Sequence, residues 1–345
     1  MLKYSLKRIL LAFITAFIII TLTFFLVKSL PGAKIFAPQE HTRLAFYLEQ
    51  VDKGYVMDCM VESPQYGTLL EKITTPDNID HYFYATPIID QYFAWLKRIV
   101  VAWDWGTSTV IKPNYSTTTI IMERLPVSVS INIISVLISV PLGILLGIVA
   151  GLNKNTWVDH TISTLVMIFI SIPSFVVISF MIYFFAFKGN LPYQWPSNDA
   201  ETSVKIAGYI IPVLSLSFGS VCSYCRSVRA ELCEVMSGEY LILARTKGLT
   251  RRQAIVRHAL RNAFVPILPS VLAEFVGVFS GSMILENLYN INGIGNLYIN
   301  ALNDKDYNVL FVDMAIFTTI YLLAGIVTDL SYGFIDPRIR MGEKK

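Results

Sequence analysis

The sequence contains little charge. Lys, Arg, Asp and Glu make up 15% of its 345 residues, whereas hydrophobic residues make up 54%. Because so few polar side chains cannot cover the surface of a soluble globule of this length, the composition excludes an ordinary soluble domain and indicates a membrane protein. Cysteine is scarce too, with four in all, and only Cys59 lies in the long polar segment 30–118. That segment therefore cannot form an internal disulfide.

Motifs for catalysis are absent as well. The chain has no Gly-x-x-x-x-Gly-Lys phosphate loop, no His-Glu-x-x-His and no Gly-x-Ser-x-Gly, and Gly293-Ile-Gly295 lacks the third glycine of a dinucleotide site. Cys222-Ser-Tyr-Cys225 has redox spacing, but no thioredoxin-like elements or His cluster accompany it, so packing of small residues is the favoured interpretation. We predict that the chain is not an enzyme and binds no metal. If it moves a solute uphill, either ions or a separate ATPase must supply the energy.

Long apolar runs are the dominant feature that is present. Four runs contain no Asp, Glu, Lys or Arg and reach the roughly 20 residues that cross a hydrocarbon core. They are Ile9–Val27, Val127–Leu152, Thr161–Phe187 and Ile206–Cys225. Ala263–Leu285, with Glu274, and Val309–Phe334, with an acidic residue near each end, also qualify. The sequence therefore predicts an all-α membrane protein with six transmembrane helices.

Basic residues predict the orientation of these helices. The N-terminus, the 153–160 loop, the 226–262 loop and the 334–345 tail together hold 16 of the 28 Lys and Arg residues. Short loops rich in Lys and Arg stay on the cytoplasmic side, so we expect both termini there. The first apolar run is longer than the core of a signal peptide and has no Ala-x-Ala site after it, which favours an uncleaved anchor.

A large insert separates the first two predicted spans. Residues 30–118 are rich in Phe, Tyr and Trp, too aromatic for a linker, so we expect a folded extracytoplasmic segment. It serves either as a docking surface at the outer mouth or as a cap packed on the helices. The predicted domains are residues 1–29 (tail and first helix), 30–118 (insert), 119–334 (transmembrane core of the other five helices, with the loop 226–262) and 335–345 (cytoplasmic tail).

The loop 226–262 combines basic and apolar residues. Gly248 interrupts one short helical run, and Thr250 with Gln253 forms a capping box that starts another. In the second run apolar residues recur at helical spacing, the basic residues fall largely elsewhere, and Pro266 marks a boundary. The apolar positions are Ile255, Val256, Ala259, Leu260, Ala263 and Phe264. This segment either lies on anionic lipid or binds a cytoplasmic partner.

Small and polar residues inside the spans indicate how the helices pack. Gly143, Gly147 and Gly151 form overlapping Gly-x-x-x-Gly steps, and Gly277 with Gly281 repeats the pattern. Prolines interrupt three spans, at Pro141, Pro173 and Pro212. Glu274 is a carboxylate within a span, which favours a place in a pathway or at a subunit contact over a neutral, hydrogen-bonded structural role.

The residues of the loop carry a family resemblance. Ala244-Arg-Thr-Lys-Gly248-Leu, followed by Arg257-His-Ala-Leu-Arg-Asn-Ala263 and Pro266, closely resembles the cytoplasmic loop of binding-protein-dependent ABC importer permeases of the dipeptide and oligopeptide branch. Motifs along the whole chain are similar to that branch in the same order: Leu6-Lys-Arg8, Leu30-Pro-Gly32, Trp105-Gly-Thr-Ser108, Ile172–Val177, Gly293-Ile-Gly295, Asp306-Tyr307 and Asp336-Pro-Arg-Ile-Arg340. Ile172–Val177 and the region from Glu286-Asn-Leu-Tyr289 to Asp306-Tyr307 look most like the oligopeptide permease B subunit.

Two departures accompany the resemblance. Ile242, Leu243 and Ala244 stand where the general loop pattern has Glu-Ala-Ala, and Glu274 stands where relatives carry an uncharged polar residue. The first is usual for the peptide branch. The second argues against a special role for the charge of Glu274.

The resemblance implies a type I ABC importer permease in the bacterial plasma membrane. The chain would form half of a peptide pathway with a C-type permease subunit. Two cytoplasmic ATP-binding subunits would drive it, and an extracytoplasmic peptide-binding protein would deliver the substrate. ATP and Mg would be bound by those partners, with no cofactor on this chain and no nucleic acid. The coupling loop would contain Tyr240, Ala244, Arg245, Lys247, Gly248, Arg251 and Arg252. Candidates for pathway or subunit contact are Pro173, Glu274, Gly277 and Gly281.

Other functions remain open at this point. Within the family the solute is either an oligopeptide or a dipeptide, nickel, haem or another small solute. Outside it, an ion-coupled carrier would need several paired charges at mid-membrane and internal repeats, and the sequence shows one mid-span carboxylate and no convincing repeat. A receptor or scaffold would explain the large insert, and solute accumulation would separate it from an importer.

Overall fold

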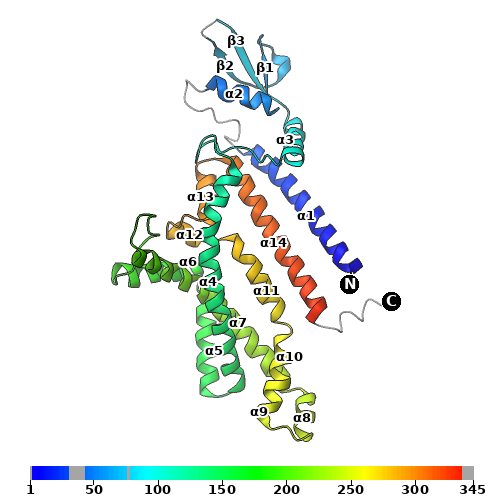
Figure 1. The fold of residues 1–345 in the computed structure, drawn as a ribbon, viewed down its shortest axis with the longest axis vertical. Coiled ribbons are helices and arrows are strands. Elements are labelled where there is room, and N and C mark those ends of the chain that lie inside the picture. Colours follow the sequence, from blue (N-terminus) through cyan, green and yellow to red (C-terminus); the bar gives the residue numbers. More distant parts are fainter. Residues whose placement is uncertain (1, 31–42, 76–77, 336–345) are drawn as a thin grey trace. The chain divides into compact units, whose positions relative to one another are not determined.

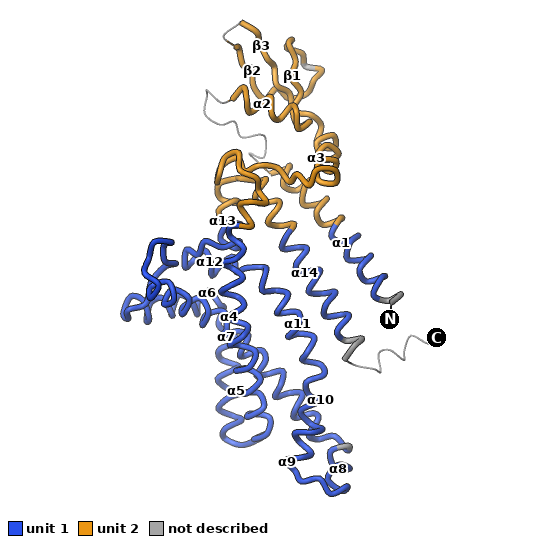
Figure 2. The backbone as a smooth tube through the Cα atoms, in the orientation of Figure 1, with its two compact units in different colours: residues 1–16, 123–299, 316–345 blue, residues 17–122, 300–315 orange. Residues whose placement is uncertain are grey.

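The computed structural model describes residues 2–30, 43–75 and 78–335, which fold mainly as helices (Figure 1). The chain forms two compact units: unit 1 comprises residues 1–16, 123–299 and 316–345, and unit 2 comprises residues 17–122 and 300–315 (Figure 2). The domains predicted from the sequence are continuous stretches of the chain, whereas each unit combines separate stretches. The predicted domain division stays a prediction. The predicted tail lies outside the described residues from Asp336 onward, as does most of the Leu30-Pro-Gly32 motif.

Among the described residues, four helices are long and apolar enough to cross a membrane. They are α1 (Leu2–Ser29), α4 (Thr117–Leu152), α7 (Thr202–Met236) and α14 (Tyr307–Ile335). Each contains one of the apolar runs that predict it. Pro141 and Pro212 lie inside α4 and α7, so these helices continue through their prolines and the predicted interruptions there are wrong.

The other two predicted spans are bent pairs of helices. The first joins Trp157–Ile170 to Ser174–Phe187 at 98°, and the second joins Arg251–Phe264 to Leu268–Ser280 at 51°. Their elements are α5 (Trp157–Ile170), α6 (Ser174–Met181), the π-helix η3 (Ile182–Phe187), α9 (Arg251–Ala254), the π-helix η4 (Ile255–Ala259), α10 (Leu260–Phe264), α11 (Leu268–Gly277) and the 3-10 helix η5 (Val278–Ser280). The described residues therefore contain four candidate membrane spans, or up to six if each bent pair is one span.

Proline explains both bends. Pro173 immediately precedes α6, and Pro266 lies between α10 and α11. A proline disfavours helical backbone in the residue before it and lacks the N–H that would continue the helix. Pro266 is thus a helix boundary, as its position in the sequence predicts. Three further helices complete unit 1 or lead out of it: α8 (Glu239–Thr246), α12 (Met283–Leu288) and α13 (Ile294–Asn303).

The first glycine series packs α4 against α7. A Cβ added to Gly143 would lie 2.7 Å from the Cβ of Tyr224, and one on Gly151 would lie 2.9 Å from Leu232. Only glycine lets the two backbones come this close, which confirms the packing face predicted from the sequence. The Gly277–Gly281 pair does not repeat it. A Cβ on Gly277 would meet nothing within 4 Å, and Gly281 ends the helical segment with φ +63°.

We expect Gly147→Ala to destabilise the protein by about 1–3 kcal/mol, the usual cost of overpacking a close interface. The added Cβ would lie 2.6 Å from the Cβ of Val228 and 2.8 Å from the carbonyl oxygen of Cys225, so the backbone of α7 must move. The melting temperature of the purified protein in detergent measures the effect. Gly219→Ala in α7 is the matched control, since its Cβ would meet nothing within 4 Å. Equal melting temperatures for the two variants would contradict this account of the α4–α7 contact.

Unit 2 contains a small sheet, which the all-α prediction missed. β1 (Val56–Cys59), β2 (Leu69–Thr74) and β3 (Asp80–Ala85) pair antiparallel in the order β1-β3-β2. Around it lie α2 (Arg43–Asp52), a short 3-10 helix η2 (Pro64–Tyr66) and α3 (Ile88–Ala102). The aromatic residues form the core of this segment: Phe83 is fully buried and stacks on Tyr47 with ring centroids 4.7 Å apart. The described part of the insert is therefore folded, as its aromatic content predicts.

Asp306 holds the loop that follows α3 to the start of α14. The carboxylate is buried and accepts hydrogen bonds from the Ser108 hydroxyl at 2.5 Å and from the amides of Val110 and Ile111 at 3.0 Å. A carboxylate held by several donors needs no cation beside it, because those donors replace its hydration. This contact gives a structural reason for two motifs that resemble the family, Trp105-Gly-Thr-Ser108 and Asp306-Tyr307.

Candidate functional site

The predicted loop forms a helical hairpin. α8 ends at Thr246, Gly248 has φ +91°, and α9 begins after Thr250. The capping box is present, because the Thr250 hydroxyl accepts from the Gln253 amide and the Gln253 side chain accepts from the Thr250 amide. The hinge and cap predicted from the sequence are therefore confirmed. Figure 1 shows α8, α9 and α10 together at the end of unit 1 away from α12.

α8 has a buried face and an exposed face. Leu241 and Ala244 are buried in a cluster with Leu232 of α7 and the alanines of the α9–α10 segment, Ala254, Ala259 and Ala263. Ile242 and Leu243 are exposed, at 63% and 56%. The exposed side of this short helix therefore carries two adjacent large apolar side chains.

The basic residues of the site are all accessible. Arg245, Lys247, Arg251 and Arg252 are exposed, and Gly248 is exposed with open space around it. The side chain of Tyr240 lies outside the described residues, although its backbone belongs to α8. The site therefore presents two apolar side chains bordered by positive charge.

One part of the predicted amphipathic pattern is wrong. Val256, assigned to the apolar face, is 57% exposed, whereas Ala259 and Ala263 are buried as predicted. The reason is local, because residues Ile255–Ala259 form a π-helix. Its wider turn shifts the register by one residue, and the regular 3.6-residue period no longer applies.

A polar cavity lies between α7 and α11, inside unit 1. Its volume is about 260 Å³, and α7 contributes a stripe of polar side chains at helical spacing, namely Ser220, Ser223, Tyr224, Ser227 and Glu231. From α11 come Ser270 and Glu274. The Ser220 hydroxyl donates to Glu274 at 2.7 Å. Polar and ionisable side chains within apolar helices usually face a water-filled cavity or a partner, and here they face a cavity.

The remaining candidates are dispersed. Pro173 lies at the 98° bend between α5 and α6 and does not line the cavity with Glu274. A Cβ added to Gly277 would meet nothing within 4 Å, whereas one added to Gly281 would lie 2.8 Å from Oε1 of Glu286. The structure thus places the residues of the predicted coupling loop in one hairpin, while the four predicted pathway or contact residues do not form one group.

Glu286 is a buried carboxylate whose role the sequence did not reveal. It is 2% exposed and accepts from the Ser128 hydroxyl at 2.8 Å, the Ser282 amide at 3.0 Å and the Asn296 amide at 3.1 Å. Burial raises the pKa of this carboxyl, and the donated hydrogen bonds counteract part of that shift. A Cβ on Gly293 would overlap with Ser128 and Glu286, which explains the first glycine of Gly293-Ile-Gly295. The sequence offered one local sign of this site, because Glu286 stands four residues after Ser282. It offered no sign of the contact with Ser128, which is distant in the sequence.

A second contact missed from the sequence joins α5 to α7. Asp159 is fully buried and receives two hydrogen bonds from the Arg229 guanidinium, at 2.5 and 2.8 Å. The Asn155 amide and the Ser163 hydroxyl also donate to it. Bidentate pairs of this kind fix both helices in register.

Comparison with known proteins identifies the family. A model described as "Binding-protein-dependent transport system inner membrane component" matches residues 143–341, which contain the hairpin, the polar cavity and Glu286. The chain belongs to this family. It is a multi-pass membrane protein and the permease component of a binding-protein-dependent ABC importer, that is, a transport subunit.

Named relatives of this permease extend over nearly its whole length. The "Dipeptide transport system permease protein DppB" of Lactococcus lactis is 29% identical over 99% of this chain and 100% of that protein. The "Oligopeptide transport system permease protein OppB" of Salmonella typhimurium is 31% identical over the same shares. A solved amino acid ABC transporter is 17% identical over 63% of this chain and 94% of that one, with a TM-score of 0.49. That more distant likeness adds nothing to the family assignment.

Proposed function

We propose that this chain is the transmembrane permease subunit of an ATP-driven oligopeptide importer and forms half of its translocation pathway. The observation that carries the proposal is the similarity to oligopeptide and dipeptide permeases across 99% of the chain. A relationship of this length covers the insert as well as the permease core. It therefore supports the same overall transport role rather than a shared loop alone.

The proposed arrangement has six spans with both termini in the cytoplasm. Four long helices and two bent pairs supply the spans, and the basic loops supply the orientation. Residues 30–118 then lie outside the cell, and the hairpin of α8 and α9 lies inside. The charge-poor outer helix surfaces, such as Phe13 of α1 at 77% exposure, contact lipid in this arrangement.

The proposed partners follow from the family. A second, C-type permease chain completes the pathway, two cytoplasmic ATP-binding subunits hold ATP and Mg, and an extracytoplasmic peptide-binding protein delivers the substrate. Ile242 and Leu243 of α8 are the side chains that enter a groove on one ATP-binding subunit. Arg245, Arg251 and Arg252 then lie at the rim, where exposed charges influence encounter and orientation more than affinity.

Movement of the ATP-binding subunit reaches the spans through the buried face of α8. Leu241 and Ala244 pack in one cluster with Leu232 of α7 and Ala263 of α10. Because packed side chains resist compression, a displacement of α8 moves the adjoining ends of α7 and α10 with it. The glycine contact then carries the motion of α7 to α4. The polar cavity beside Glu274 lies on the α7 and α11 surfaces that such a motion rearranges, and we assign it to the wall of the pathway.

Dipeptides are the second candidate substrate. The relatives from Lactococcus lactis and Bacillus subtilis are named dipeptide permeases and are each 29% identical to this chain. Peptide backbones offer the same donors and acceptors whatever their length. The permease alone therefore does not have to discriminate strongly between the two.

Uptake of a labelled peptide tests the proposal. We expect cells that express this chain with a C-type permease subunit, two ATP-binding subunits and a peptide-binding protein to accumulate a labelled tetrapeptide, and depletion of ATP to abolish the accumulation. A labelled dipeptide in the same cells separates the two candidates. Assembly with the ATP-binding subunits but no accumulation of either peptide would retain the family and contradict peptide import.

A further inference from the structure

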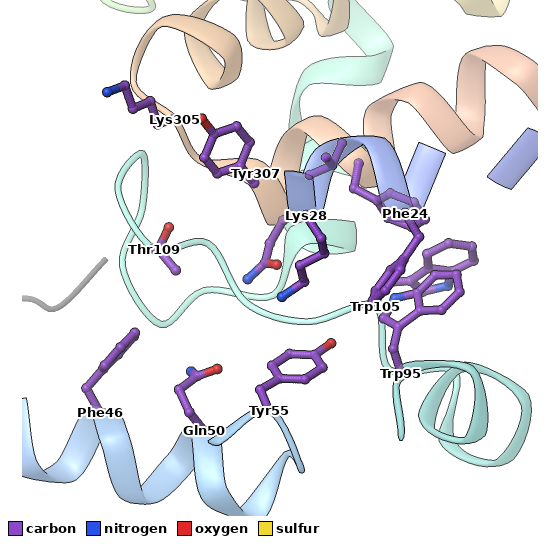
Figure 3. A pocket seen from close by; sticks show the side chains of 13 residues that line it. Phe24, Lys28, Phe46, Gln50, Tyr55, Trp95, Trp105, Thr109, Lys305 and Tyr307 are labelled. Atoms are coloured by element: carbon purple, nitrogen blue, oxygen red, sulfur yellow. The ribbon is translucent and has the colours of Figure 1, made fainter. Parts of the chain in front are cut away.

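Unit 2 contains a cavity with an unusual lining. Its volume is about 70 Å³, and its walls include aromatic rings, among them Tyr55 and Trp105, and the polar side chains of Lys28, Gln50 and Thr109 (Figure 3). These residues come from α1, α2 and the segments that precede β1 and follow α3. By the same measure one water needs roughly 10–15 Å³, so the cavity admits a group of a few heavy atoms.

Lys28 supplies a positive charge to this cavity. Its ammonium group lies 4.3 Å from the ring centre of Tyr55 and 5.8 Å from that of Phe24. Figure 3 shows the side chain directed between Tyr55 and Gln50. In the described part of the chain no carboxylate forms a salt bridge with Lys28. Among the described residues, the partners of this cation are therefore aromatic faces, which attract it through the negative potential above the rings.

Tyr55 does not act as the missing anion. Burial raises the pKa of its phenol to about 12, so the ring is neutral near pH 7. It carries a second cation, since the Arg98 guanidinium lies 4.7 Å from the ring centre and donates to the hydroxyl at 2.5 Å. Arg98 has its own partner in Asp104, 3.6 Å away. Within the described ranges, Lys28 has no such carboxylate partner, and neither does Lys305, an exposed lysine that also lines the cavity.

Gln50 provides an independent sign of a ligand. The residue is 8% exposed, and its side-chain amide makes no hydrogen bond with any residue that the structure describes. The amide atoms are not among the fully enclosed polar atoms that lack a partner, so they reach the space of the cavity, where a bound group would hydrogen-bond to them. The amide lines the cavity across from Lys28 (Figure 3). A group that accepts from the ammonium and from the amide N–H would satisfy both.

We propose that this cavity binds the C-terminal carboxylate of a peptide, with Lys28 as the cation and Gln50 as the hydrogen-bonding partner. The carboxylate accepts from both side chains, and the Gln50 carbonyl is free to accept the last amide N–H of the peptide. The rings of Tyr55 and Trp105 contact the terminal side chain. The size of the cavity limits it to the end of the peptide, so the site recognises a free terminus and not a sequence. This inference rests on the proposed function, because it takes the transported peptide as the ligand.

The test uses the assembled transporter in lipid nanodiscs without the binding protein. Two N-terminally labelled tetrapeptides of one sequence are compared, one with a free C-terminal carboxylate and one with a C-terminal amide. We expect the free acid to bind at least about tenfold more tightly, the usual effect of losing a hydrogen bond to a charged group. Lys28→Met should remove the preference, and Gln50→Leu should weaken binding of the acid. Lys97→Met, at an exposed lysine of α3, should change neither.

Acylation of lysines, measured by mass spectrometry, locates the ligand. The free acid should slow acylation of Lys28 several-fold and leave Lys97 unaffected, whereas the amide should protect neither. Equal affinity of acid and amide, or a preference that survives Lys28→Met, would overturn the proposal. Protection of Lys28 by the peptide-free binding protein, with none by the free acid, would assign the cavity to an acidic side chain of that protein and also overturn it.

ATP-driven uptake in the same preparation separates this inference from the proposed function. Uptake of the tetrapeptide without any preference for the free acid contradicts the cavity assignment alone. A preference for the free acid that depends on Lys28, without uptake, supports the cavity assignment and contradicts peptide import. Absence of both results contradicts both proposals.

Discussion

Replacing Gly248 with valine is expected to reduce ATP-driven peptide uptake to background while the protein stays in the membrane at wild-type abundance. Gly248 has φ +91°, a conformation that a β-branched residue adopts only with strain of roughly 1–3 kcal/mol. A Cβ there would meet nothing within 4 Å, so the substitution disturbs the backbone turn and not the packing. The turn sets the position of α8 relative to α9. A displaced α8 carries Ile242 and Leu243 away from the surface that they present to the ATP-binding subunit.

Two further variants make this prediction specific. Gly248→Asn should retain part of the uptake, because asparagine tolerates positive φ better than valine does. Cysteines placed at 243–247 should form crosslinks with an ATP-binding subunit in the wild-type background and lose them in Gly248→Val. Unchanged uptake at equal abundance would show that the turn has no part in coupling. Crosslinks to lipid alone would favour the interpretation of α8 as a helix lying on the membrane surface.

Local patterns in the sequence predicted the local features of this hairpin. Thr250 and Gln253 are three residues apart, and their capping box is made entirely by short-range hydrogen bonds. The hinge at Gly248 was also indicated locally, because this glycine interrupts one helical run just before the capping box that starts the next. The apolar runs likewise predicted the long helices, because crossing a membrane requires an uninterrupted stretch of side chains that is visible in the sequence alone.

The bends could not be predicted from proline alone. Pro141 and Pro212 lie within continuous helices, whereas Pro173 lies at a 98° bend. All three residues remove one backbone donor. Neighbouring helices and side chains decide whether the chain tolerates that loss within a straight helix or bends. This depends on packing between distant segments, which a single sequence does not display.

The sheet in unit 2 was missed for a different reason. The composition of residues 30–118 showed a folded segment, but its strands are short, and β3 alone carries the aromatic residues typical of a strand. The sequence of β2, Leu-Leu-Glu-Lys-Ile-Thr, is compatible with a helix as much as with a strand. Pairing with β3 decides its conformation, and that pairing includes an irregular register between Leu69 and Glu71.

Among the polar residues, the sequence indicated Glu274 and missed Glu286. Glu274 lies within an apolar run, where any charge is conspicuous. Glu286 lies in a polar stretch, Glu286-Asn-Leu-Tyr-Asn, where a carboxylate is unremarkable. Its importance arises from Ser128, 158 positions earlier in the chain, and from glycines that leave room for the carboxylate. Burial and long-range partners are properties of the fold and not of the local sequence.

Replacing Glu286 with alanine is expected to destabilise the protein by several kcal/mol and to lower its abundance in the membrane severely. The change leaves the Ser282 amide, the Asn296 amide and the Ser128 hydroxyl without their acceptor. Each buried donor left unsatisfied costs about 1–3 kcal/mol, and the cavity adds to that cost. Because Ser128 belongs to α4 and Asn296 to α13, the loss also separates α12 from its two neighbours. The thermal unfolding midpoint in detergent and the amount of inserted protein both measure the effect.

Glu234→Ala provides the matched control for Glu286→Ala. Glu234 is an exposed carboxylate in α7, so its removal should change the midpoint little. Gly293→Ala tests the same site from the other side, since its added Cβ overlaps with Ser128 and Glu286 and must displace the carboxylate from its donors. We expect Gly293→Ala to lower stability in the same direction as Glu286→Ala, and the double variant to lose much less than the sum of the two, because both single changes break the same hydrogen bonds. Fully additive losses would show that Glu286 and Gly293 act independently and that the carboxylate does not hold α12 in place.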